Sequence, residues 1–180
     1  MKSPEFKAAA TPEHWSPKLT DTSPNTEGSV SAPNLTTDGS QHSGWGSLVY
    51  LASPHGHPNP DVREWRFRQV CLAAAELIKA DVMPFSPIAH SHPIANLANL
   101  HVSWEFWKTF DTAMILRCQE LWVLQLPGIR ESVGCLAEVE FARTLGTPVV
   151  WCAPEDLIPD YDPALAELIY QSGAVPKGVL

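Results

Sequence analysis

The sequence lacks any apolar run that approaches the ~18 residues needed to cross a membrane. It also lacks the basic start, apolar stretch and small-residue cleavage site that together make a signal peptide. We therefore expect a soluble, cytoplasmic protein that has no membrane partner.

Cysteine is scarce, and none of the four cysteines form a C-x-x-C pair. All four lie in apolar segments, which is typical of reduced thiols in a protein core. His90 and His92 are close in sequence, but cysteine or acidic partners at metal-ligand spacing are missing. We expect no metal or other cofactor, and we expect His90 to contact substrate.

Positive charge is also limited, with 12 basic residues against 20 acidic residues and a net charge of -8. This balance disfavours a nucleic-acid polymer or an anionic membrane as a partner. A small anionic ligand stays possible, because a few local donors can outweigh the overall charge.

The 180 residues divide into two parts by composition. Residues 1–46 contain seven Ser, six Thr and five Pro, with only scattered large apolar residues. Such a segment cannot bury enough surface to offset its chain entropy, so we expect a flexible arm. Residues 47–180 have the composition of one folded domain, and we expect the function to lie there.

Strand and helix patterns alternate through the second part. We expect strands at 47–52, 82–88, 121–126 and 149–152, and helices at 60–80, 104–117, 133–145 and 163–170, with a long loop at 89–102. This order predicts an α/β fold, namely a flavodoxin-like or Rossmann-like doubly wound parallel sheet of four to five strands with helices on both faces. Ligands bind such sheets at the carboxyl ends of the strands, so the loops after the first three strands should form the site.

One carboxylate lies on the wrong side of its predicted helix. At 100° per residue, the apolar residues nearest Glu138 fall within about 60° of it, whereas Glu140 faces the opposite side. A glutamate that faces a core is costly unless it is paired or functional. Gly134, one turn earlier on the same face, would let a ligand approach closely.

The preceding helix repeats this anomaly, because Asp111 is also centred on an apolar face. A single misplaced carboxylate is often structural, but two on successive helices point to paired acid and nucleophile chemistry at an acetal-type carbon. Apolar surroundings can separate the pKa values of such a pair and hence their roles.

Several other residues have weaker claims. The Tyr50 hydroxyl could reach a carboxylate or could simply be bonded to backbone. Ser132 could only cap its helix, or could help bind phosphate at the helix N-terminus. Trp107 is more often a core residue than a stacking platform for a base, and Ser53 lies in the first loop of the expected site.

Three segments resemble the nucleoside 2-deoxyribosyltransferase family, which includes the deoxynucleoside 5′-monophosphate N-glycosidases. They are Tyr50-Leu-Ala-Ser-Pro54, Asp111 with a strand some ten residues later, and Ser132-Val-Gly-Cys-Leu-Ala-Glu138. The resemblance covers most of residues 47–152, and the 85–93 segment looks more like an uncharacterised branch of the superfamily. The first loop lacks the glycine-rich pattern of the monophosphate hydrolases.

The resemblance implies specific roles. Glu138 matches the nucleophile that forms a covalent glycosyl-enzyme, Asp111 the acid that assists departure of the base, and Tyr50 the residue that holds the nucleophile. Ser132 matches a serine that binds the 5′-phosphate in the monophosphate hydrolases, which hints at a nucleotide substrate. It also implies a homodimer or larger homo-oligomer, because sites in this family borrow residues from a neighbouring subunit.

The sequence therefore predicts cleavage or transfer of the N-glycosidic bond of a nucleoside or nucleotide. One alternative is a nucleotide-binding sensor that has kept the pocket without turnover. Another is a structural partner domain whose arm makes the interaction.

Overall fold

The computed structural model describes residues 46–179. The flexible arm predicted over residues 1–46 lies, except for Gly46, outside the described residues. Within this range no helix is both long and apolar enough to span a membrane.

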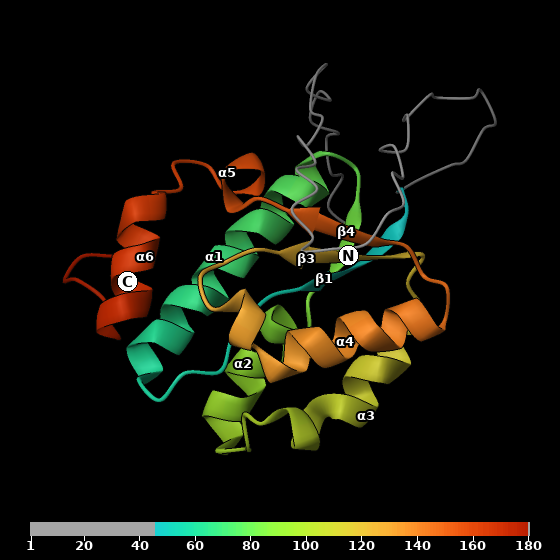
Figure 1. The fold of residues 1–180 in the computed structure, drawn as a ribbon, viewed down its shortest axis with the longest axis horizontal. Coiled ribbons are helices and arrows are strands. Elements are labelled where there is room, and N and C mark those ends of the chain that lie inside the picture. Colours follow the sequence, from blue (N-terminus) through green and yellow to red (C-terminus); the bar gives the residue numbers. More distant parts are fainter. Residues whose placement is uncertain (1–45, 180) are drawn as a thin grey trace, which may run out of the picture.

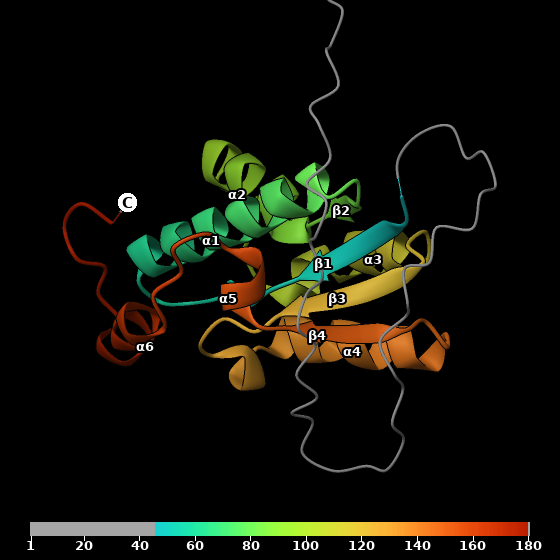
Figure 2. The same cartoon turned by 90° about the horizontal axis from the view of Figure 1, so that it is seen from above.

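The centre of the fold is a four-stranded sheet in which all strand pairs are parallel (Figure 1). Its strands are β1 (Leu48–Ala52), β2 (Met83–Phe85), β3 (Glu120–Leu124) and β4 (Val149–Cys152), in the spatial order β2-β1-β3-β4. Figure 2 shows β1, β3 and β4 side by side. This order is the one found in flavodoxin-like doubly wound folds, so the predicted fold class is confirmed.

Helices cover both faces of the sheet. These are α1 (Pro60–Lys79), α2 (Pro87–Ala98), α3 (Trp104–Ile115), α4 (Val133–Thr144), α5 (Pro154–Leu157) and α6 (Pro163–Ser172). In Figure 1, α3 and α4 lie on one side of the sheet and α1 and α5 on the other. Successive residues of β1 point to opposite faces, so Leu51 packs in the cluster with α1, and Tyr50 packs in the cluster with α3 and α4.

Local signals explain where two of the helices begin. The Asn59 side chain accepts a hydrogen bond from the Asp61 amide at 2.9 Å, with Pro60 at the first helical position of α1. The Ser132 hydroxyl accepts one from the Cys135 amide at 3.5 Å and caps α4 as predicted. Ser103 precedes α3 but makes no capping side-chain hydrogen bond.

The prediction of a long loop at 89–102 is wrong, because most of this segment forms α2. Ser86 caps this helix by accepting from the Ala89 amide, Pro87 occupies its first turn, and Asn99 ends it in the left-handed conformation at φ 51°. Pro93 lies inside the helix, where it cannot donate a backbone hydrogen bond. The short strand before it is also reduced, from the predicted 82–88 to Met83–Phe85.

The four cysteines are free thiols. Cys135 and Cys152 are buried as predicted, whereas Cys71 and Cys118 are only partly buried.

Candidate active site

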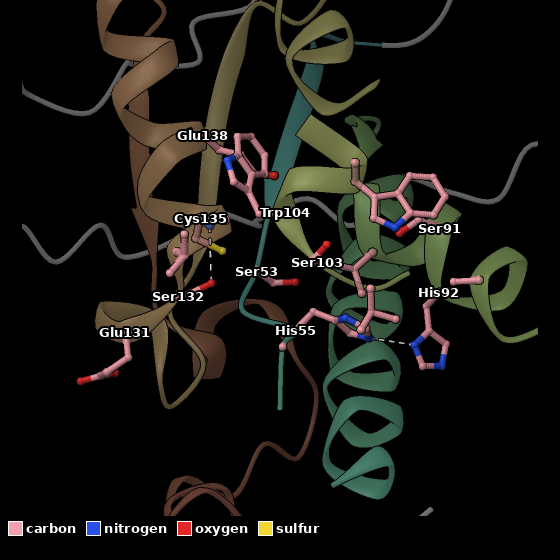
Figure 3. Close-up of a pocket in the computed structure, with 17 residues that line it drawn as sticks. Ser53, His55, Ser91, His92, Ser103, Trp104, Glu131, Ser132, Cys135 and Glu138 are labelled. Atoms are coloured by element: carbon pink, nitrogen blue, oxygen red, sulfur yellow. Dashed lines mark hydrogen bonds between the residues drawn. The ribbon is translucent and has the colours of Figure 1, made fainter. Parts of the chain in front are cut away.

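A cavity of about 310 Å³ opens at the carboxyl edge of the sheet. Its walls come from the segment after β1, from α2, and from the first turns of α3 and α4 (Figure 3). The volume is at the small end of the range that holds a drug-sized ligand. The position agrees with the edge predicted from the alternation of strands and helices.

Glu138 lies in the wall of this cavity and is only 5% exposed. The Tyr50 hydroxyl, itself fully buried, donates a hydrogen bond of 2.7 Å to Glu138 Oε1. Burial raises the pKa of Glu138 to about 8, the Tyr50 hydrogen bond opposes this rise, and the nearby Asp111 adds to it. Burial, followed by the negative charge of Glu138, holds the pKa of Tyr50 well above its usual range, so the phenol stays a donor.

Asp111 is also buried, at 5% exposed, and it lies one turn beyond Trp107 on α3. Burial raises its pKa to about 7. Among the described residues, its Oδ1 atom is buried with no hydrogen-bond partner. Buried polar atoms are nearly always paired, so a buried carboxylate oxygen without a partner makes Asp111 a candidate functional group.

The structure brings most of the other predicted site residues to this cavity. Ser53, Trp107, Ser132 and Gly134 all line it. A Cβ added at Gly134 would meet a Trp104 ring carbon at 3.8 Å, an ordinary contact, so packing within the protein does not require glycine there. Ser53 Oγ is buried and, in the part of the chain that the structure describes, makes no hydrogen bond.

Tyr50, Asp111 and His90 are not among the residues that line the cavity. Tyr50 is hydrogen-bonded to Glu138, and Asp111 lies further along α3 than the lining residues Trp104 and Trp107. His90 is exposed, and its ring stacks on Phe110 with centroids 5.1 Å apart. The structure therefore places His90 away from the space where a ligand would lie.

Sequence reasoning missed a second polar cluster in the cavity wall. His55 and His92 are buried, and His55 Nε2 lies 2.8 Å from His92 Nδ1. His92 Nε2 in turn lies 3.0 Å from Glu64 Oε2 on α1. The missed signal was the helical spacing of Ser91 and Ala95, which turns one side of α2 toward the cavity.

Arg66 fixes the rim of the cavity at the end of β1. It is buried, and its guanidinium donates to the Gly56 carbonyl at 2.9 Å and to the Pro127 carbonyl at 2.8 Å. The loops after β1 and β3 are therefore tied together. Gly128, at φ 88°, passes so close that an added Cβ would lie 2.6 Å from Arg66 Nη2.

Across residues 46–179, no group of three or more His, Cys, Asp and Glu side chains is arranged to hold a metal ion.

Residues 47–153 match the family described as Domain of unknown function (DUF1937). The chain belongs to this family. The matched range runs from the start of β1 to the end of β4 and includes Tyr50, Asp111 and Glu138. Every residue that lines the cavity also falls inside it, so the cavity is a feature of the DUF1937 domain itself. No curated protein matches the chain.

Proposed function

We propose that this DUF1937 protein cleaves or transfers the N-glycosidic bond of a nucleoside or nucleotide, with Glu138 as the nucleophile. The observation that carries the proposal is the buried Glu138 carboxyl in the cavity wall, held by the Tyr50 hydroxyl at 2.7 Å. The second support is Asp111, which is buried near it and whose Oδ1 atom has no hydrogen-bond partner within the described part of the chain. These are the residues whose sequence context resembles the nucleoside 2-deoxyribosyltransferase family.

The proposed reaction has two steps. In the first, the Glu138 carboxylate forms a bond to the anomeric carbon while the C–N bond breaks, and Asp111 gives its proton to the departing base nitrogen. In the second, water or another base attacks the anomeric carbon, and its proton passes to Asp111. The C–O bond to Glu138 breaks, and the electron pair returns to the carboxylate. No cofactor takes part in either step.

The electrostatics of the site favour Asp111 as the acid, and the hydrogen bond from Tyr50 supports Glu138 as the nucleophile. The acid must carry a proton, and burial raises the pKa of Asp111 to about 7, so a large fraction is protonated at neutral pH. The nucleophile must be ionised, but burial raises the pKa of Glu138 to about 8, above that of Asp111, so only a fraction of the molecules holds an ionised Glu138 together with a protonated Asp111. The Tyr50 hydrogen bond increases this fraction, because it favours the ionised form of Glu138. Positive charge that develops at the anomeric carbon would stabilise the carboxylate further.

The proposal extends to assembly and to location. A homodimer or larger homo-oligomer in the cytoplasm is part of it, and Val102, Val133 and Leu136 near the cavity are exposed apolar side chains that a second subunit could cover. Light scattering after size-exclusion chromatography tests the assembly, and a monomer at micromolar concentration would contradict it.

The deciding experiment is chromatography of free bases after incubation with a panel of nucleosides and 5′-monophosphates, with and without a second base. Release of base by the wild-type protein, and its loss in Glu138→Ala with an unchanged circular dichroism spectrum, supports the proposal. Base exchange identifies a transferase, and release only into water identifies a hydrolase. Normal activity of Glu138→Ala would refute the assignment of the nucleophile.

One observation favours a second candidate, a nucleotide-binding module without turnover. Asp111 does not line the cavity, so the acid would have to reach the base from a deeper position. Nucleotide binding detected by calorimetry, together with no base release from any substrate, would favour this module over the enzyme.

A further inference from the structure

The end of the cavity away from Glu138 holds a chain of three hydrogen-bonded side chains. His55 Nε2 lies 2.8 Å from His92 Nδ1, and His92 Nε2 lies 3.0 Å from Glu64 Oε2. Figure 3 shows His55 and Glu138 at opposite ends, with Ser53 and Ser103 between them. The catalytic steps proposed above do not use this chain, so it needs a role of its own.

Glu64 fixes the direction of the hydrogen bonds. Its other oxygen accepts from Arg68 Nε at 2.9 Å, and this bond is the main reason that the pKa of Glu64 is lowered, so the carboxylate is ionised and can only accept. His92 Nε2 must then carry the hydrogen. The Asn96 amide nitrogen also lies 2.9 Å from Nε2, but two donors cannot bond each other. The Nε2 hydrogen therefore goes to the Glu64 carboxylate, the stronger acceptor, and the Asn96 nitrogen makes no hydrogen bond to this ring.

The protonation of His92 Nε2 also decides which ring nitrogen of His55 carries a hydrogen. Because His92 Nε2 is protonated, His92 Nδ1 has a lone pair and accepts from His55 Nε2–H. The remaining ring nitrogen of His55, Nδ1, therefore carries a lone pair and no hydrogen. The chain thus presents a hydrogen-bond acceptor in the cavity wall.

The surrounding charges do not turn this acceptor into a donor. Burial lowers the pKa of His55 to about 3, with smaller contributions from His92, Arg63 and Arg66, so the ring is neutral. Among residues 46–179, those that line the cavity include Glu131 and Glu138 and no lysine or arginine. Arg63 and Arg66, the nearby cations, donate to the backbone carbonyls of His57, Pro58, Gly56 and Pro127.

We propose that this end of the cavity is a subsite for an uncharged hydroxyl, which donates to His55 Nδ1, and that it rejects a phosphate ester in the same place. The inference rests on the proposed function, which puts the anomeric carbon at Glu138 and the base toward Asp111 on α3. The 5′-substituent then extends to the His55 end. The preferred substrate is a nucleoside and not its 5′-monophosphate, which opposes the hint from Ser132, whose hydroxyl caps α4.

His92 and Glu64 are positioning residues in this proposal. One substitution should reverse the donor and acceptor roles in the hydrogen bonds from Glu64 through His92 to His55. In Glu64→Gln the amide can donate to His92 Nε2, so that His92 Nδ1 donates to His55 Nε2, and His55 Nδ1 becomes the hydrogen-bearing nitrogen. The subsite would then offer a donor to an anion. Glu76→Gln is the matched control, because Glu76 is on the same helix and pairs with Lys79.

The test begins with the tautomers. Nitrogen-15 NMR of the histidine rings should show hydrogen on Nε2 of both His55 and His92 in the wild type and in Glu76→Gln, and on His55 Nδ1 in Glu64→Gln. Inorganic phosphate should shift the His55 signals only in Glu64→Gln. Hydrogen on His55 Nδ1 in the wild type, or equal phosphate shifts in all three proteins, would overturn the proposal.

The kinetic arm compares a 2′-deoxynucleoside with its 5′-monophosphate. The wild type should prefer the nucleoside, and Glu64→Gln should lower the ratio of the two kcat/KM values by about tenfold or more, as expected when one hydrogen bond changes sign. An unchanged ratio in Glu64→Gln, or a wild-type preference for the monophosphate, would refute the subsite. If the wild type releases no base at all, the proposed function fails, and the NMR arm still decides the direction of the chain and its response to phosphate.

Discussion

The two faces of the sheet differ in the side chains that their helices bury. The face covered by α1, α5 and α6 has a closed apolar core in which Leu51, Leu77 and Leu124 are fully buried. The face covered by α3 and α4 has a smaller apolar cluster around Tyr50, and Asp111 and Glu138 are buried on the same two helices. Both faces use β1, since Tyr50 and Leu51 point to opposite sides of one strand.

This difference separates stability from chemistry. Burial of an ionisable group costs free energy unless the group is neutral or paired, and the raised pKa values of Asp111 and Glu138 express that cost. The apolar face carries no such cost in its core cluster. Substitutions on the two faces should therefore act on different observables.

The largest effect is expected from Glu138→Gln. The amide keeps the shape of the side chain but cannot attack carbon, so base release should fall on the order of 10⁴-fold or more while the fold persists. Glu140→Gln is the matched control, since Glu140 is exposed on the same helix. If Glu140→Gln lost as much activity as Glu138→Gln, the loss could not be assigned to the buried carboxylate.

Asp111→Asn should slow base release by roughly 10²–10⁴-fold, because the amide cannot supply the proton. Above neutral pH, however, the Asp111→Asn protein should be more stable than the wild type. The folded-state pKa of Asp111 is raised, so the folded protein binds the extra proton, and wild-type stability falls as pH rises from about 4 toward about 7. Urea unfolding at pH 5 and pH 7 should show a smaller loss of stability in Asp111→Asn than in the wild type.

Leu77→Ala tests the apolar face. It should lower the free energy of unfolding by about 2–5 kcal/mol, since a fully buried side chain is removed, and it should leave kcat/KM nearly unchanged at a temperature where the protein is folded. Leu72→Ala on the same helix, at an exposed position, should change neither quantity appreciably. A large loss of activity in folded Leu77→Ala would show that the faces are coupled.

Tyr50→Phe should have the smallest effect. Its hydrogen bond lowers the pKa of Glu138, so its loss should raise that pKa further and move the rising limb of the activity profile to higher pH. Burial raises the pKa of Asp111 to about 7 and that of Glu138 to about 8, so the kcat/KM of the wild type should peak between these values. A profile of Tyr50→Phe with the wild-type optimum would remove Tyr50 from its holding role.

Much of the fold was predictable because local signals agree with the tertiary structure. Asn59-Pro60 and Ser132 mark helix starts, and the short apolar strands are bounded by prolines and loops. The α2 helix was missed because Pro93 and the surrounding His and Asn residues are typical of loops. The better signal was Ser86-Pro87, a cap followed by proline in the first turn.

The site was only partly predictable for a similar reason. Helix periodicity places Asp111 and Glu138 on apolar faces, which is a property of one element at a time. The contact between His55 and His92 joins residues 37 positions apart, and the bond from His92 to Glu64 joins residues 28 apart. Such contacts depend on how α1 and α2 pack, and no local pattern specifies that packing.

The two hydrogen bonds by which Arg66 ties the loops after β1 and β3 together have an evolutionary consequence. Arg66 bonds to the backbone carbonyls of Gly56 and Pro127, and every residue type offers a carbonyl, so the side chains of those two positions can drift without loss of the tie. Gly128 is different, because its φ of 88° strains any other residue, and an added Cβ would lie 2.6 Å from Arg66 Nη2 and 2.7 Å from the Tyr170 ring. Across descendants of this chain, position 128 should therefore stay glycine, while Gly56 and Pro127 can be replaced without loss of the two hydrogen bonds from Arg66.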